Sequence, residues 1–279
     1  MDKKGIEIYM NSGISVISAF AAWKGAALAL DRQMIMRITR TDSPKNTRNI
    51  NMILKILSRE VGKESDLTVE ILQKIPSGMG LKSSSALVAG IVKGYFLMNE
   101  IEKETAEIVS ISSKISREIR VSTTGAADDL YASLLGGLCV TDNRKNSLAR
   151  RYNISPTDYI MIMAPKKISS YEMKKVDLSH LKFAYNRMWQ RVNAYNYEDM
   201  ALINGFYLST SSGKTMDMPD LRGLRFNWAG INGKGSSLFL RYDKREVAAG
   251  DVEKIRRRGY NCFVAKSTNT GASYKWLND

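Results

Sequence analysis

The sequence predicts an α+β protein built from two closely packed domains. Stretches with the apolar pattern of strands and stretches with helical spacing are mixed through both halves of the chain. The 279 residues exceed one average domain. A polar, basic stretch at 144–158, which contains Pro156, is a candidate linker. We therefore expect an N-terminal domain of residues 1–150 and a C-terminal domain of residues 151–279.

The N-terminal half is predicted to begin with buried strands. Ile14–Leu30 is rich in small and branched apolar residues, which indicates strands joined by a tight turn near Lys24-Gly25. The remaining elements of this half are expected as helices at 49–61, 83–99 and 105–120 and as strands at 67–75 and 134–140. The helix at 83–99 is apolar on most sides and should be buried.

The C-terminal half repeats this mixture. Its apolar runs predict strands at 159–164, 238–242 and 261–266 and helices at 183–208 and 252–258, the first of them broken near 193–197. No internal repeat or low-complexity segment interrupts the pattern.

Cysteine and histidine content excludes several kinds of site. Cys139 and Cys262 lie far apart in apolar settings, which excludes a disulfide framework and a cysteine zinc site and fits a reducing cytoplasm. His180 is the sole histidine, so no multi-histidine metal site can form. No segment has the ~18 uninterrupted apolar residues of a membrane span, and no membrane partner is expected.

The net charge of +14 leaves open what the basic residues serve. An excess of this size favours polyanionic partners such as RNA, small phosphorylated substrates, or a basic solvated surface. The densest run, from Lys254 to Arg258, is not interleaved with the aromatic residues that stack on bases. We therefore expect no nucleic acid and keep a basic RNA-binding protein as the alternative.

One segment carries the strongest chemical signal. It follows a predicted strand and opens the buried helix, and its residues are Pro76, Ser77, Gly78, Met79, Gly80, Leu81, Lys82, Ser83, Ser84, Ser85 and Ala86. The glycines let the backbone turn sharply and approach a ligand, and a serine hydroxyl can cap the helix. The N–H groups and dipole of a helix start attract an anion. We expect a triphosphate here, with Lys82 adding positive charge.

This segment is not a Walker A loop. That loop requires glycine directly before the lysine, and Leu81 stands there. The order P-x-G-x-G-L-x-S-S-x-A instead resembles the second motif of the GHMP kinases, named for galactose, homoserine, mevalonate and phosphomevalonate. The form G-x-G-L-K-S-S-S-A is similar to that of the archaeal shikimate kinases.

Two further stretches agree with this resemblance. Residues 13–19 with 24–27 resemble the first conserved segment of those enzymes, and 229–237 resembles the third, glycine-rich motif with Gly233 and Gly235. The stretch 200–207 resembles the helix that opens the second domain of the family. The resemblance implies the two-domain GHMP fold, with a ferredoxin-like C-terminal domain and ATP bound between the domains.

The resemblance also implies catalytic and metal-binding residues. Mevalonate-type members carry the catalytic aspartate seven residues before a glycine pair, which corresponds here to Asp129, with Asp128 as the alternative if the register slips by one. A magnesium-binding glutamate eleven residues earlier corresponds to Glu118, and the second motif serine, Ser84, would be the other Mg²⁺ ligand. Lys24 is a further catalytic candidate because it could lie beside the base and lower the pKa of that group, and the alternative is that it only ends a strand.

The implied activity is transfer of the γ-phosphate of ATP to the 3-hydroxyl of shikimate, a step of aromatic amino-acid biosynthesis. Homoserine kinase or another GHMP metabolite kinase is the alternative within the family. The acceptor carries a carboxylate, for which Arg117, Arg120 and Lys214 are candidates. The sequence does not predict the oligomeric state.

Overall fold

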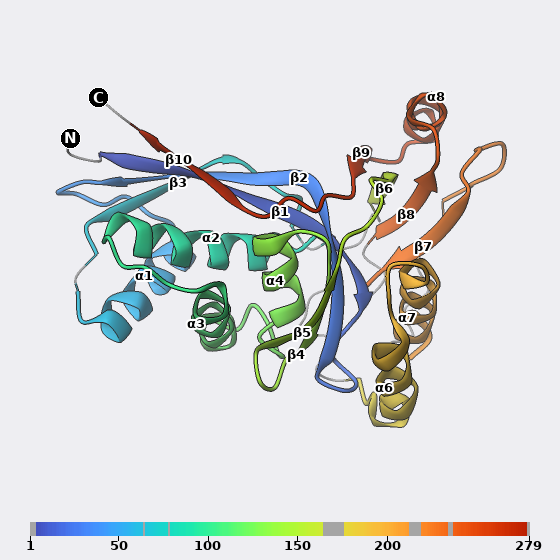
Figure 1. Ribbon diagram of the computed structural model, residues 1–279. Helices are drawn as coiled ribbons and strands as arrows, with labels where there is room; N and C mark the ends of the chain where they lie inside the picture. Colours follow the sequence, from blue (N-terminus) through green and yellow to red (C-terminus); the bar gives the residue numbers. More distant parts are fainter. Residues whose placement is uncertain are drawn as a thin grey trace.

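The computed structural model describes residues 4–63, 65–77, 79–163, 176–211, 219–233 and 237–277. Strands from both ends of the chain join in one sheet, and a second sheet lies at the opposite end of the molecule (Figure 1). Helices pack against both sheets, which confirms the predicted α+β class.

The first sheet is organised around a long hairpin of β1 and β2. Its strands are β1 Gly5–Ile17, β2 Lys24–Arg40, β3 Leu67–Gln73, β4 Leu138–Asp142, β5 Ser147–Tyr152 and β10 Ser273–Leu277. They run in the order β10-β1-β2-β4-β5, with β3 also paired to β2, and all pairs are antiparallel. The length of β2 lets its beginning pair with β4 and its end with β3.

Four helices gather on one side of this sheet (Figure 1). They are α1 Arg48–Val61, α2 Ser83–Met98, α3 Thr105–Glu118 and α4 Ala127–Leu135. The central helix α2 is buried on most sides, as predicted, and contacts β1, α3 and α4. It approaches the hairpin closely at Gly94, where a Cβ atom would lie 2.7 Å from Ile8 Cδ1. This close packing holds the later turns of α2 against the hairpin, and the serine-rich motif lies at the other end of the helix.

The second sheet has the predicted ferredoxin-like arrangement. Its elements in chain order are β6 Asp158–Met163, the 3₁₀ helix η1 Ser179–Leu181, α6 Lys182–Arg191, α7 Tyr197–Ser211, β7 Trp228–Asn232, β8 Ser237–Tyr242, α8 Arg245–Arg257 and β9 Cys262–Lys266. The strands lie in the order β7-β8-β6-β9, all antiparallel. This is the strand order of a β-α-β-β-α-β unit.

One predicted linker is a strand instead. The stretch 144–158 contains β5, which pairs with β4 at the edge of the first sheet. Of the two arginines of β5, Arg151 is exposed and Arg150 is half-buried, and edge strands commonly carry charged residues because these discourage pairing with other chains. The chain passes to the second sheet between Tyr152 and Asp158 and returns in β10. The domain limits at residue 150 stay a prediction.

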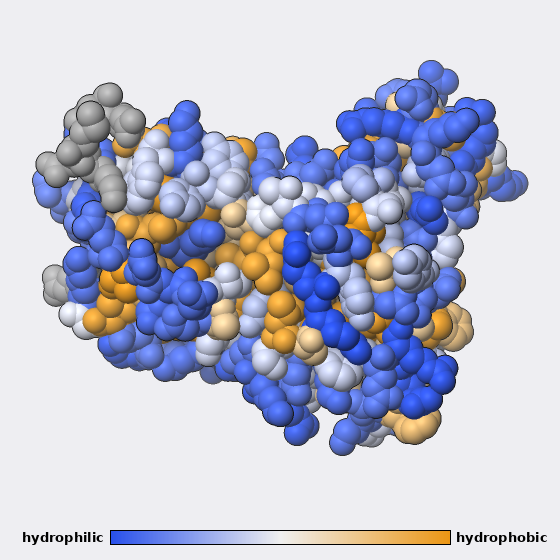
Figure 2. Space-filling view, in the orientation of Figure 1, coloured by the Kyte–Doolittle hydropathy of each residue, from blue (hydrophilic) through white to orange (hydrophobic). Residues whose placement is uncertain are grey.

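The surface around α8 is hydrophilic. In the space-filling view, the end of the molecule that carries α8 is mostly hydrophilic, with smaller hydrophobic areas between the polar residues (Figure 2). The last turn of this helix carries Lys254, Arg256 and Arg257, and both Lys254 and Arg256 form ion pairs with acidic residues of the same helix. None of the described helices is both long enough and apolar enough to cross a membrane.

Candidate active site

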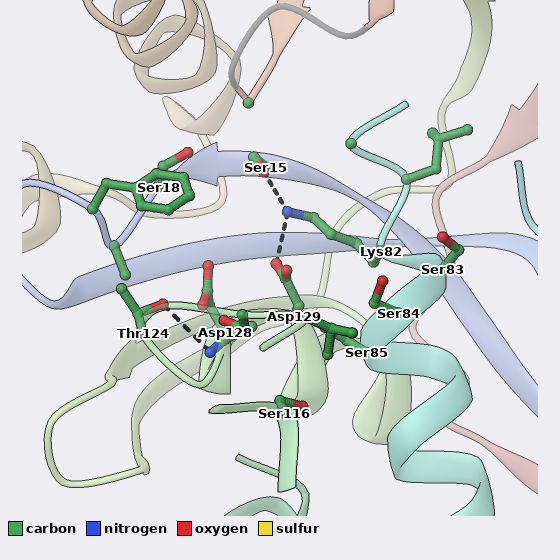
Figure 3. Close-up of a pocket in the computed structure, with 18 residues that line it drawn as sticks. Ser15, Ser18, Lys82, Ser83, Ser84, Ser85, Ser116, Thr124, Asp128 and Asp129 are labelled. Atoms are coloured by element: carbon green, nitrogen blue, oxygen red, sulfur yellow. Dashed lines mark hydrogen bonds and ion pairs between the residues drawn. The ribbon is translucent and has the colours of Figure 1, made fainter. Parts of the chain in front are cut away.

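A cavity of about 150 Å³ lies where the first sheet, its helices and the second sheet meet. The end of β1, the start of α2, the end of α3 and the start of α4 each contribute to its wall (Figure 3). Its lining residues are Ser15, Ser18, Ala19, Phe20, Gly80, Leu81, Lys82, Ser83, Ser84, Ser85, Ser116, Val121, Ser122, Thr124, Ala126, Asp128, Asp129 and Gly233. Lys82 is the sole basic side chain among these described residues.

The start of α2 presents backbone donors to this cavity. The helix begins at Ser83, directly after Lys82, which has a left-handed backbone with φ of 68°. Among the described residues, no side chain caps the start of this helix with a hydrogen bond, so the structure shows no serine cap there. The first N–H groups of a helix have no partner within the helix. Together with the helix dipole they make this end of the cavity suited to an anion.

The predicted phosphate-binding residues separate into two groups. Gly80 to Ser85 line the cavity, whereas Pro76, Met79 and Ala86 do not. Ala86, in the first turn of α2, faces the buried core. The backbone oxygen of Met79 accepts a hydrogen bond from the Ser237 hydroxyl at 2.8 Å. Gly78 lies outside the described residues.

Lys82 joins three elements of the site. Its Nζ donates a hydrogen bond to the Ser15 hydroxyl of β1 and forms an ion pair with Asp129 Oδ1 at 2.6 Å (Figure 3). The side chain is only 7% exposed, whereas that of Asp129 is 17% exposed. The lysine predicted to contact phosphate therefore also contacts the predicted base.

Asp128 lies beside this pair but in different surroundings. It is almost fully buried, and its Oδ1 accepts a hydrogen bond from Asn143 Nδ2 at 2.8 Å. Gly25 makes room for it, because a Cβ atom there would lie 2.6 Å from the carboxyl carbon. Burial and the neighbouring charge of Asp129 raise the pKa of Asp128 to about 7, against the opposing effects of Lys82 and Asn143.

The structure places Lys24, the further catalytic candidate, at the first residue of β2. It does not line the cavity, and its Nζ lies 4.5 Å from the ring centroid of Trp189 on α6. Successive residues of a strand face opposite sides of a sheet. Gly25 packs against Asp128, so the side chain of Lys24 is directed away from it. Lys82 occupies the place beside the carboxylates instead.

Glu118, the predicted magnesium ligand, is also outside the cavity lining. Its carboxylate forms an ion pair with Arg59 of α1 at 2.9 Å and does not line the cavity. Ser116 does, from the same helix. Residues two positions apart in an α-helix point in directions about 200° apart around the axis, so Ser116 and Glu118 face different ways. The spacing of eleven residues before Asp129 identifies a glutamate at this position of the chain, but it does not specify the face of α3 on which the side chain lies.

The third motif reaches the cavity through Gly233, which has φ of +56°. A Cβ atom there would lie 3.1 Å from the Ser15 hydroxyl. Gly235 lies outside the described residues, as does Lys214. Neither Arg117 nor Arg120 lines the cavity, so the partner of an acceptor carboxylate stays a prediction.

The structure adds residues that sequence reasoning missed. Ser15, Ser116, Thr124, Asn143 and Asn232 either line the cavity or hold residues that do. Ser15 and Asn232 fall inside the first and third resembling segments, which was a usable signal. Among the described residues, no three or more His, Cys, Asp or Glu side chains cluster as a metal site would require.

Comparison with known proteins agrees with this geometry. Residues 48–137, which include the start of α2 and both aspartates, match the model of the GHMP kinase N-terminal domain. The chain is 29% identical over 281 residues to a shikimate kinase of Thermoplasma acidophilum, with 99% of each chain covered. It is 32% identical over 206 residues to the shikimate kinase of Methanosarcina acetivorans, with 69% of each covered.

A solved structure shares the fold. The mevalonate kinase of Methanococcus jannaschii superposes with a TM-score of 0.72 at 14% identity, covering 94% of this chain and 98% of that one. Identity this low speaks for the fold alone, whereas the archaeal relatives match in sequence over most of the chain. The chain belongs to the GHMP kinase family, together with the archaeal shikimate kinases that it resembles.

Proposed function

We propose that this protein transfers the γ-phosphate of ATP to the 3-hydroxyl of shikimate. The observation that carries the proposal is the Lys82–Asp129 ion pair, placed in a cavity next to the uncapped start of α2. An anion-binding helix end and a carboxylate beside it are what phosphoryl transfer to an alcohol needs. The shikimate kinases among the relatives favour shikimate as the acceptor.

In this proposal, the triphosphate lies against the N–H groups at Ser83–Ser85. Lys82 adds a point charge that a phosphate oxygen can share with Asp129. Phosphoryl transfer depends chiefly on positioning and on neutralising charge. A buried cation between the base and the phosphate serves both requirements.

Asp129 is the proposed base for the acceptor hydroxyl. It is the more exposed of the two carboxylates and lies in the first turn of α4, where the helix dipole stabilises its negative charge. Asp128 is the alternative, although Asn143 already occupies one of its oxygens. A carboxylate within hydrogen-bond reach of the hydroxyl removes its proton as the bond to phosphorus forms.

The cavity also fits Mg²⁺. This ion prefers oxygen ligands, keeps several waters and is commonly held by one or two protein groups together with substrate phosphates. Ser84 and Ser116 bring hydroxyl groups to the cavity wall next to the two carboxylates (Figure 3). We propose that Ser84 is a ligand and that Glu118 is not. When bound, the ion neutralises charge on the transferring phosphate.

An acceptor screen tests the proposal. ATP consumption is measured with shikimate, homoserine, mevalonate and pantoate, and the product is identified by phosphorus and proton NMR. We expect turnover with shikimate, phosphorylated at the 3-hydroxyl, and little with the others. Faster turnover of another acceptor would overturn the assignment of substrate. Tight, salt-sensitive RNA binding without any kinase activity would favour the RNA-binding alternative.

A further inference from the structure

Asn232, at the end of β7, is a polar side chain buried without any exposed surface. Burying an amide is unfavourable unless its hydrogen bonds are made. Its Oδ1 accepts the backbone N–H of Ser15 at 2.9 Å, although the two residues are 217 positions apart. Its Nδ2 donates to the Ser237 hydroxyl at 3.1 Å. Both ends of the amide are therefore occupied.

The second end leads to the loop before α2. The Ser237 hydroxyl donates to the backbone oxygen of Met79 at 2.8 Å, and Asn232 Nδ2 lies 3.5 Å from the same oxygen. A Cβ atom on Gly80 would lie 3.2 Å from that nitrogen. The loop thus runs directly over the amide and is tied to it.

Both contacts of Asn232 converge on Lys82. Ser15, held by its backbone, provides the hydroxyl that accepts the hydrogen bond from Lys82 Nζ. Met79 and Gly80 lead within a few residues to Lys82, whose left-handed backbone is uncommon for a residue other than glycine. Such a conformation persists where its surroundings hold it.

We propose that Asn232 is a positioning residue that places Lys82 against Asp129 by fixing Ser15 and the Met79–Gly80 loop to each other. This role rests on the proposed phosphoryl transfer, but the contacts themselves do not require it. The consequence is that the second sheet supports the phosphate-binding lysine, so the site depends on both sheets being in place.

Asn204 of α7 offers a matched control. It is equally buried, and its Oδ1 accepts the backbone N–H of Ser18 at 2.9 Å, three residues along the same segment. Its Oδ1 also accepts a hydrogen bond from the Tyr185 hydroxyl at 3.2 Å, within the second half of the chain. Replacing it removes a bond of the same kind at a different point of the segment.

The carboxyl of Asp128 reports where Lys82 lies. The charged groups that act on it are Asp129 of the same helix and Lys82 from the start of α2, and Asn143 donates a hydrogen bond to it. The Lys82 charge lowers the pKa of Asp128, so displacing Lys82 raises it further. Carboxyl carbon NMR of aspartate-labelled protein measures this titration without any acceptor, with the signal assigned by its loss in Asp128→Asn.

The experiment compares Asn232→Ala, Asn204→Ala and Lys82→Met with the wild type. We expect the Asp128 titration to move upward by about half a pH unit or more in Asn232→Ala and in Lys82→Met, and to stay in place in Asn204→Ala. In the double variant Lys82→Met/Asn232→Ala, the Asp128 titration should lie where it does in Lys82→Met alone, because Asn232 acts on Asp128 through Lys82. Comparing the single and double variants isolates this coupling. The kcat for shikimate should fall about tenfold in Asn232→Ala, as expected for a displaced catalytic group.

A milder variant guards against misfolding. Ser237→Ala removes the hydroxyl that links Asn232 to Met79 and leaves the Asn232 amide in place. We therefore expect the pKa of Asp128 to rise by less than in Asn232→Ala. Two results would overturn the role of Asn232. One is an unchanged Asp128 titration in both Asn232→Ala and Ser237→Ala. The other is that Asn232→Ala shifts the Asp128 titration equally in the wild type and in Lys82→Met. If the wild type phosphorylates no acceptor, the proposed function fails while the NMR result still decides this inference.

Discussion

At the scale of single residues, two adjacent carboxylates differ because their neighbours differ. Asp129 faces Lys82, whereas Asp128 is enclosed by Gly25 and Asn143. The sequence placed both aspartates beside a phosphate-binding motif, but it could not separate their environments. These depend on side chains brought together by strand pairing, such as Gly25 of β2 and Asn143 just after β4.

The raised pKa of Asp128 predicts a pH-dependent effect of Asp128→Asn on stability. The folded pKa is about 7 and the ordinary value is 3.8, so the folded state holds this proton more tightly than the unfolded state. The stability from this group is therefore full below the unfolded pKa and is lost as the pH rises to about 7. Asparagine cannot ionise, so the Tm of the variant relative to the wild type should rise between about pH 4 and pH 7 and change little at higher pH.

Thermal melting of both proteins across this pH range checks the prediction. A gain of 1 kcal/mol corresponds to roughly 2–4 °C in Tm for a protein of this size. A Tm difference that is constant with pH, or that shrinks as the pH rises, would show that Asp128 does not titrate in the folded protein as described.

The two magnesium candidates should respond oppositely to mutation. Ser84→Ala removes a hydroxyl from the cavity wall and should raise the magnesium concentration needed for half-maximal activity, because the ion tolerates little change in its ligands. Glu118→Gln serves as the control, since its carboxylate pairs with Arg59 outside the cavity. Magnesium titrations at saturating ATP measure both. Equal responses of the two variants would contradict the assignment.

At the scale of elements, the spacing of apolar residues in the sequence predicted most helices and strands of the first half of the chain. The helix expected at 83–99 is α2 at Ser83–Met98, because a long apolar run after a turn motif leaves little alternative. The basic strand β5 and the largely exposed strand β10 were missed. β5 is polar and basic, and β10 is only five residues long and largely exposed, so pairing with a neighbouring strand is what identifies them as strands.

The closeness of α2 to the hairpin can be tested at Gly94. A Cβ atom there would overlap Ile38 and lie 2.7 Å from Ile8 Cδ1, so Gly94→Ala should push α2 outward. Overpacking of a core costs about 1–3 kcal/mol, and a shift of the whole helix should also raise the KM for ATP, because the serine-rich motif begins the same helix.

Gly250→Ala is the matched control, since this helical glycine of α8 has nothing within 4 Å of the added atom. Alanine should stabilise that helix by about 0.5–1 kcal/mol. Denaturant unfolding and ATP kinetics check both variants. A harmless Gly94→Ala would mean that α2 can shift without disturbing the site.

At the scale of the whole molecule, the family resemblance predicted the ferredoxin-like sheet, and the strand order confirms it. The convergence of distant segments on one cavity was less accessible. Ser15 and Asn232 are brought together by packing of the two sheets, and spacing along the chain contains no direct signal for such a contact. The positions of Lys24 and Glu118 outside the cavity lining were inaccessible for the same reason, because spacing along the chain does not determine which side of a strand or helix faces the site.

The most direct test of the account is the kcat of Asp129→Asn with ATP and shikimate, measured beside calorimetric ATP binding. The amide keeps the size of the side chain and removes the charge that accepts the proton. General-base assistance is worth about 10²–10⁴-fold, so kcat should fall by that order while ATP binding changes little. Asp128→Asn should lower kcat by a smaller factor. A kcat within tenfold of the wild type in Asp129→Asn would contradict the assignment of this residue as the base, and a larger loss in Asp128→Asn would exchange the two roles.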